Sequence, residues 1–259
     1  MKYSKIEWTE ATWNPSIGCD KVSAGCKFCY AEVMAQRLQA MRTPGYKNGF
    51  EFKILPERIE APLKINKPTK FFVNSMSDLF HERMPYAFLD RVFATIRKTP
   101  HHTYQILTKR EMNLEKYFRS RIVPDNVWLG VTVEISKKKN RIDVLRNIDA
   151  KIRFLSIEPL LENIGKLDLA GIHWVIVGGE SGHGARPMKP EWAIDIQRQC
   201  DKQNVSFFFK QWGAWGADGL KRNKKANGRI LLGKEWNEEP KYELPKKKLV
   251  QNSMRPQAL

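Results

Sequence analysis

The sequence predicts an α/β fold built on a parallel sheet, a partial or complete parallel (β/α) TIM-like barrel. Apolar, β-branched or aromatic runs recur along the chain, and each is followed by a polar stretch of helical character. Runs such as FFV, WLGV and WVIV are apolar on successive residues, which is typical of parallel strands covered on both faces. Polar motifs come directly after these runs, where the carboxyl ends of parallel strands build one active-site mouth.

The expected elements alternate along the chain. The expected strands are residues 70–74, 103–107, 126–133, 151–157, 173–177 and 205–209. The expected helices, with apolar residues three or four apart, are residues 30–42, 86–97, 113–121, 137–148 and 190–203. This alternation favours a barrel over an open doubly wound sheet, although periodicity alone does not separate the two.

The length of 259 residues is within the range of one barrel domain, which we expect over residues 1–213. From residue 214 onward the composition changes, because Lys and Arg are in excess in KRNKK and PKKK and no clear period is present. We therefore expect residues 214–259 to form a basic C-terminal appendage and tail. Such a tail either is simply solvated or contacts nucleic acid.

Charge and hydropathy limit the class of protein. No apolar run approaches the roughly 20 residues that a membrane helix needs, so we expect no membrane partner. The amino terminus lacks the apolar region and cleavage site of a signal peptide, so we expect a cytoplasmic protein. The net charge of +17 predicts either a polyanionic partner such as nucleic acid or a surface that serves solubility alone.

Three of the four cysteines lie close together, with six residues between Cys19 and Cys26 and two between Cys26 and Cys29. Clustered thiolates in a reducing compartment bind metal. A structural zinc site normally has a fourth ligand at a recognisable spacing, and none is evident here. Three thiolates on a four-iron cubane instead leave one iron open for a substrate or cofactor. Zinc binding and incidental cysteines remain alternatives.

The cysteine segment resembles that of the radical S-adenosylmethionine (SAM) superfamily, because an aromatic residue precedes the last cysteine and a helix follows it. The wider string WTxxTWNPxxGCxxxSxGCxxCYA resembles the phage and bacterial three-Cys-motif family, an uncharacterised family related to those enzymes. The motifs LTKR, WLGVTVE, RFLSIEPLL, WVIVGGESG and FFFKQWG extend this resemblance over about residues 6–213. The superfamily usually has a shorter first spacer than the six residues here, which leaves the placement of Cys19 open.

The resemblance implies a barrel of the radical SAM type, a 4Fe-4S cluster and S-adenosyl-L-methionine as cofactors. It also implies an electron donor such as a flavodoxin or ferredoxin, and a separately encoded protein partner is conceivable. In this interpretation the metal ligands are Cys19, Cys26 and Cys29. The cofactor-binding residues are Phe28, Tyr30, Ser75, Asp78, Thr132 and Glu134. The residues facing the substrate, with catalytic roles, are Glu158, Glu180, Lys210 and Gln211.

Several of these residues have a simpler interpretation. Ser75 and Asp78 follow an expected strand and could instead cap the next helix. Strand alternation would put Thr132 and Glu134 on the same side. Glu158 could form an ion pair with Lys109, Arg110 or Lys210, since a buried carboxylate needs a partner.

The sequence therefore predicts a radical SAM enzyme that acts on a nucleic acid or a nucleotide-containing substrate. The rival hypothesis is a zinc-stabilised nucleic-acid-binding protein without radical chemistry. Metal content distinguishes the two.

Overall fold

A computed structural model describes residue 4 and residues 6–242 of the chain. The expected lysine cluster at residues 246–248 lies outside the described residues. None of the helices in the described part is both long and apolar enough to cross a bilayer.

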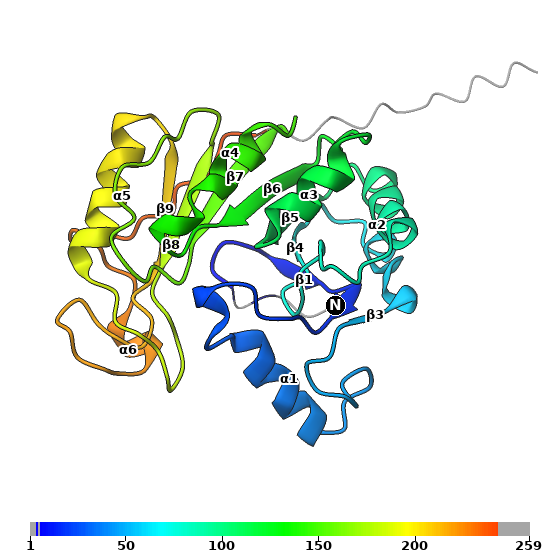
Figure 1. The fold of residues 1–259 in the computed structure, drawn as a ribbon, viewed down its shortest axis with the longest axis horizontal. Helices are drawn as coiled ribbons and strands as arrows, with labels where there is room; N and C mark the ends of the chain where they lie inside the picture. Colours follow the sequence, from blue (N-terminus) through cyan, green and yellow to red (C-terminus); the bar gives the residue numbers. More distant parts are fainter. Residues whose placement is uncertain (1–3, 5, 243–259) are drawn as a thin grey trace, which may run out of the picture.

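Seven parallel strands form one sheet in the order β1-β4-β5-β6-β7-β8-β9, curled into a half-barrel (Figure 1). The strands are β1 (Ala11–Trp13), β4 (Lys70–Val73), β5 (Thr103–Thr108), β6 (Val127–Thr132), β7 (Ile152–Ile157), β8 (Trp174–Gly178) and β9 (Ser206–Gln211). All six expected strands are confirmed, with ends shifted by no more than two residues. Within the described chain β1 and β9 are the two edges of this sheet, so the barrel is partial.

Two features of the sheet were not expected from the sequence. The edge strand β1 has only three residues, and it pairs with β4 ahead of the first expected strand. A separate antiparallel pair joins β2 (Ser16–Ile17) to β3 (Lys53–Ile54). The β2 strand leads directly into the first cysteine of the cluster segment.

Helices cover the convex face of the sheet, where their apolar sides build the main core (Figure 1). They are α2 (Tyr86–Lys98), α3 (Glu111–Phe118), α4 (Asn140–Arg146) and α5 (Pro190–Lys202). The α1 helix (Tyr30–Ala40) extends away from the sheet, and the short α6 (Lys224–Asn227) lies in the appendage. Short 3₁₀ helices occur at Ala24–Cys26, Pro56–Arg58, Ala61–Lys64 and Ser136–Lys138.

Two expected helices have different bounds in the structure. The helix expected at residues 113–121 is α3, which begins and ends earlier. The helix expected at residues 137–148 is divided into the 3₁₀ turn Ser136–Lys138 and the shorter α4.

The concave interior of the half-barrel has an aromatic base. Its buried apolar side chains are Trp8, Phe72, Trp128, Ile152, Phe154, Trp174, Ile176 and Phe208. Gly130 makes room for this packing, because a Cβ at that position would lie 2.4 Å from the Phe154 ring. Inward positions nearer the strand ends carry polar groups, which begin the site described below.

The segment after residue 213 packs along the last strand. The Phe209 amide donates to the Trp236 carbonyl at 3.0 Å, and the Trp174 indole donates to the Glu238 carbonyl at 2.7 Å. The Trp212 indole is buried and donates to the Ile230 carbonyl at 2.9 Å. The segment is therefore tied to the barrel by backbone and indole hydrogen bonds, and the expected boundary at residue 213 stays a prediction.

Candidate active site

A cavity of about 430 Å³ opens at the carboxyl ends of the parallel strands, beneath the cysteine segment. Every predicted site residue except Glu134 lines it. These lining residues are Cys19, Cys26, Phe28, Cys29, Tyr30, Ser75, Asp78, Thr132, Glu158, Glu180, Lys210 and Gln211. Parallel strands converge at this edge, which explains why residues far apart in the sequence meet here.

The three clustered cysteines are held in two different ways. The Cys19 amide donates to the Phe50 carbonyl at 3.2 Å, and the Gly18 amide donates to the Met76 carbonyl at 2.9 Å. Gly18 has a φ of 74°, and a Cβ there would lie 2.0 Å from the Glu51 carbonyl oxygen, so this approach requires glycine. By contrast, Cys26 ends a 3₁₀ turn and Cys29 immediately precedes α1. Cys19 thus belongs to the body of the protein, and the other two belong to a loop.

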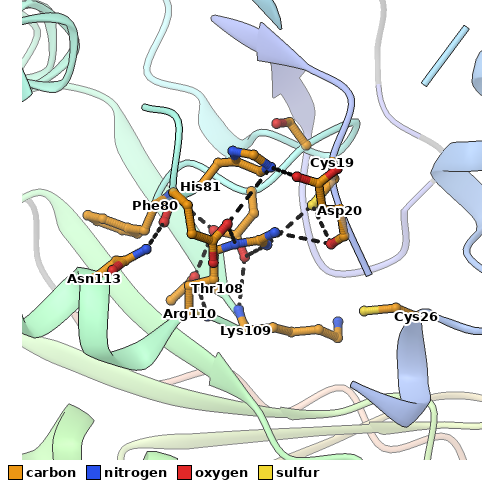
Figure 2. Close-up of polar contacts among 12 residues, drawn as sticks. Cys19, Asp20, Cys26, Phe80, His81, Thr108, Lys109, Arg110 and Asn113 are labelled. Atoms are coloured by element: carbon orange, nitrogen blue, oxygen red, sulfur yellow. Dashed lines mark hydrogen bonds and ion pairs between the residues drawn. The ribbon is translucent and has the colours of Figure 1, made fainter. Parts of the chain in front are cut away.

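Arg110 connects the Cys19 sulfur to the sheet, as Figure 2 shows. Its Nη1 group donates to Cys19 Sγ at 3.3 Å and to Asp78 Oδ2 at 3.2 Å. Its Nε group donates to Glu82 Oε2 at 2.7 Å, and Nη2 donates to the Asp20 carbonyl at 3.1 Å. The buried guanidinium of Arg110 therefore connects the first cysteine to two loops by hydrogen bonds.

His81 supports the same segment from behind. Its Nδ1 atom accepts from the Arg83 amide at 3.1 Å, so Nε2 carries the proton and donates to Asp20 Oδ2 at 3.0 Å. The ring stacks on Phe52 with centroids 4.0 Å apart. Burial and the Arg110 charge lower the pKa of His81, which keeps the ring neutral. With both nitrogens engaged, His81 is not free to ligate a metal.

The electrostatic surroundings of the thiols differ. Burial and the Asp78 carboxylate raise the pKa of Cys19 to about 11, although Arg110 opposes them. Burial also disfavours the Cys26 thiolate, but the Lys109 charge and hydrogen bonds from Val22 and Ser23 outweigh it and lower the pKa of Cys26. Figure 2 shows the Lys109 side chain extended toward Cys26. Positive charge thus lies close to the sulfurs.

The three cysteines are free thiols, and each is exposed in part. In the described residues no group of three His, Cys, Asp or Glu side chains is arranged to hold one metal ion. A structural zinc draws four donors to one centre, with thiolates at about 2.3 Å. A cubane presents a separate iron to each thiolate and needs only three of them if one iron stays open.

Asp78 lines the cavity, but its carboxylate already has several partners. It accepts from Thr108 Oγ1 at 2.7 Å, from the Phe80 amide at 3.0 Å and from the Lys109 amide at 3.0 Å, besides Arg110. These bonds join the loop after β4 to the loop after β5. Asp78 does not cap the next helix, because the N-cap of α2 is Pro85. Direct cofactor binding by Asp78 stays a prediction.

Ser75 and Tyr30 contact each other across the cavity mouth. The Tyr30 hydroxyl donates to the Ser75 carbonyl, and the Ser75 hydroxyl donates to Asn14 Oδ1 at 3.2 Å. Phe28, the other aromatic residue of the predicted adenine side, lies below the Arg186 guanidinium with 5.4 Å between the guanidinium carbon and the ring centroid. Both rings flank the cysteines from the loop side.

Thr132 is the last residue of β6, and Glu134 lies two residues beyond the end of that strand. Glu134 is fully buried, accepts from Arg141 Nη1 at 3.0 Å and from the Gly25 amide at 3.4 Å, and supports the cysteine loop from beneath. Only Thr132 reaches the cavity, where its hydroxyl accepts from Lys109 Nζ at 3.3 Å.

The residues predicted to face the substrate form two ion pairs. Lys210 Nζ lies 2.7 and 2.9 Å from the two carboxylate oxygens of Glu158, the pairing that the sequence left open. Glu180 forms a bidentate pair with Arg186, with contacts of 2.6 and 2.8 Å. The Gln211 amide nitrogen donates to Ser181 Oγ at 3.1 Å, while its carbonyl oxygen is buried with no hydrogen-bond donor among the described residues.

Lys109 and Arg110 were predicted only as cations near the mouth, without a role at the sulfurs. The signal for that role was the LTKR motif, which puts two cations directly after β5. Arg110 has carboxylate partners, whereas Lys109 forms no ion pair within the described part of the chain. The ammonium of Lys109 is thus available to an anionic group in the cavity.

Comparisons with known proteins give a family and a few similar structures. Residues 3–240 match the profile of a family described as "Protein of unknown function (DUF5131)". Spore photoproduct lyase complexed with dinucleoside spore photoproduct is similar at 11% identity and a TM-score of 0.43, covering 78% of this chain and 63% of that one. A mutant of that lyase with bound AdoMet and the same dinucleoside is similar at 12% identity and a TM-score of 0.41, covering 78% and 64%. The chain spans less than two thirds of the length of these structures. No curated protein matches the sequence.

Proposed function

The chain belongs to the DUF5131 family of proteins of unknown function, and we propose that it is a radical SAM enzyme with a 4Fe-4S cluster on Cys19, Cys26 and Cys29. The observation that carries the proposal is the donor set at the cavity. Three free thiols, those of Cys19, Cys26 and Cys29, line one mouth. Such a set matches a cubane with one open iron.

The cofactors would supply the reactive chemistry, and the chain would supply binding and orientation. When bound, the cluster and SAM would supply radical chemistry: one electron from an external donor, passed through the cluster, would cleave the sulfonium bond and so generate the predicted 5′-deoxyadenosyl radical. Phe28 and Tyr30 offer aromatic surface for the adenine, and the hydroxyl of Thr132 offers a hydrogen bond. The ammonium of Lys109 offers a partner for the cofactor's carboxylate.

The interior of the half-barrel favours radical chemistry in a second way. Below the polar mouth, the cavity reaches the aromatic base at Trp8 and Phe72, and both side chains are buried. An apolar floor excludes water from the site and limits side reactions there. The chain's contribution at this end is therefore a dry and rigid wall.

The proposed substrate is a nucleic acid or a nucleotide-containing molecule. The net charge of +17 exceeds the magnitude of about 2 to 8 that small domains need for solubility. Lys210 and Lys224 bring cations to the cavity wall, where phosphate groups could bind. Lys210 is paired with Glu158, and this ion pair would face the substrate.

Titration calorimetry with SAM tests the proposal. Protein reconstituted anaerobically with iron and sulfide should bind SAM, and metal-free protein should bind it far more weakly, because the open iron forms part of the site. The Cys200→Ala variant is the control, since Cys200 is buried in α5 away from the cavity. Equal affinity with and without the cluster would contradict the proposal.

A further inference from the structure

We propose that Arg110 is a positioning residue that holds the Cys19 ligand and raises the reduction potential of the cluster through an N–H···S hydrogen bond. This inference rests on the proposed function. It concerns a residue that the cysteine motif does not contain and that lies ninety-one positions from Cys19 in the sequence.

The geometry makes Arg110 specific to one ligand. Its side chain is only 3% exposed, and Nη1 lies 3.3 Å from Cys19 Sγ. The side-chain hydrogen bond of the Cys26 sulfur is instead with a neutral group, the Ser23 hydroxyl at 3.6 Å, although the Lys109 side chain extends toward this sulfur. Of the sulfur contacts within the described residues, the Arg110 contact is the one made by a permanent cation.

The Arg110 contact compensates for the long spacer between Cys19 and Cys26. With six residues between Cys19 and Cys26, the loop itself does not fix the first sulfur relative to the other two. Arg110 fixes the position of this sulfur instead, because it binds both the Cys19 sulfur and the Asp20 carbonyl. A rigid guanidinium with several donors suits this task better than an ammonium.

The same contact affects the electron equilibrium. Reduction adds one electron to the oxidised cluster, so a nearby cation and an N–H donor stabilise the reduced form more than the oxidised form. Asp78 and Glu82 partly balance the Arg110 charge, at 3.2 and 2.7 Å. The potential should therefore fall when Arg110 loses its charge and rise when Glu82 loses its charge.

Redox titration with dithionite, followed by electron paramagnetic resonance of the reduced cluster, tests this. In Arg110→Gln we expect about a tenfold shift of the equilibrium toward the oxidised form, which is about 59 mV for one electron. Arg110→Lys should recover part of the shift, because it restores the charge without the fork. Glu82→Gln should shift the potential in the opposite direction, and its side chain is 56% exposed, so the variant should fold normally.

Arg146→Lys is the control. Arg146 lies outside the cavity and pairs with Asp143 and Asp168 at 2.6 and 3.2 Å, with no sulfur contact within the described chain. This variant should have the reduction potential of the wild type. If Arg110→Gln does not fold, the other two variants still test the proposal, because the reduction potential should fall in Arg110→Lys and rise in Glu82→Gln.

The outcomes separate this inference from the proposed function. A wild type without iron after reconstitution would overturn both. A wild type with a cluster, and Arg110 and Glu82 variants with unchanged potentials, would overturn the role of Arg110 alone.

Discussion

The two ends of the half-barrel interior use the same strands for different tasks. Along β7, Phe154 belongs to the aromatic base and Ser156 lines the cavity two residues later. Along β9, Phe208 and Lys210 make the same change. Side chains two residues apart in a strand point to the same face. Each inward-facing row therefore has an apolar packing residue at the base and a polar cavity residue at the mouth. The base should therefore dominate stability, and the mouth should dominate function.

The two ends also differ in the partners that their buried side chains need. Trp174 is completely buried and packs against Phe154 and Phe208 with ring centroids 5.8 and 5.9 Å away. Such packing needs no partner charges. At the mouth, each carboxylate facing inward has a cationic or hydrogen-bonding partner, as Glu158 has Lys210. A largely buried pair of this kind contributes little net stability.

The largest expected effect is loss of the cluster from the mouth. Cys19→Ala, Cys26→Ala and Cys29→Ala should each abolish iron binding, because a cubane with one open iron needs all three thiolates. Iron analysis and absorbance after anaerobic reconstitution measure this. Cys200→Ala should keep the full iron content. Full iron content in a Cys26→Ala variant would remove that thiol from the ligand set.

The second prediction compares stabilities at the two ends. Trp174→Ala should lower the free energy of unfolding by about 3–5 kcal/mol, because it empties the centre of the base. The double variant Glu158→Gln with Lys210→Met should change it by about 1 kcal/mol or less, since both partners of the pair are neutralised together. Urea denaturation of the metal-free protein gives both values. A larger loss of unfolding free energy in the mouth variant than in the base variant would contradict the claim that the base dominates stability.

The sequence predicted the sheet because parallel strands buried on both faces leave continuous apolar runs. It missed β1, since three residues with Thr12 between Ala11 and Trp13 make too short a run. It also predicted which polar residues reach the mouth, because they directly follow strands. The exception is Glu134, which does not line the cavity and follows a strand that ends at residue 132, one residue before the expected end.

The contacts at the mouth were harder to predict. The choice of partner for Arg110 among Asp78, Glu82 and the Cys19 sulfur depends on how three loops meet. No local pattern encodes that meeting, because the partners are between 28 and 91 residues apart in the sequence. The ion pair of Glu158 was expected only as one of several possibilities for the same reason.

The third prediction concerns binding of nucleic acid at the mouth. Replacing Lys221, Lys224 and Lys225 by Ala should flatten the salt dependence of binding, by about 0.7 in the log–log slope for each phosphate of a single strand that the variant no longer neutralises. Fluorescence anisotropy with a short single-stranded DNA at several salt concentrations measures the slope. Iron content should not change. An unchanged slope would show that these lysines of the appendage do not bind phosphate.

The smallest expected effect is a pH dependence outside the mouth. Burial and the charge of neighbouring His101 lower the pKa of His102, whose Nδ1 atom accepts from the Thr69 amide at 3.2 Å. The unfolded chain takes up this proton near pH 6.5 and the folded chain only at lower pH. The contribution of His102 to stability is therefore complete above about pH 6.5 and is lost as the pH falls below it.

Urea midpoints at pH 7.5 and 5.5 for the wild type and for His102→Gln test this sign. The variant should lose less stability on acidification than the wild type, because the other titrating groups are common to both. An equal loss in the two proteins would show that His102 does not contribute to the pH dependence.

The central claim is that Cys19, Cys26 and Cys29 bind an iron–sulfur cubane, and metal analysis of the anaerobically reconstituted wild type tests it most directly. We predict a brown protein with about four irons and matching sulfide per chain. A colourless protein with one zinc per chain, and no iron after reconstitution, would contradict it.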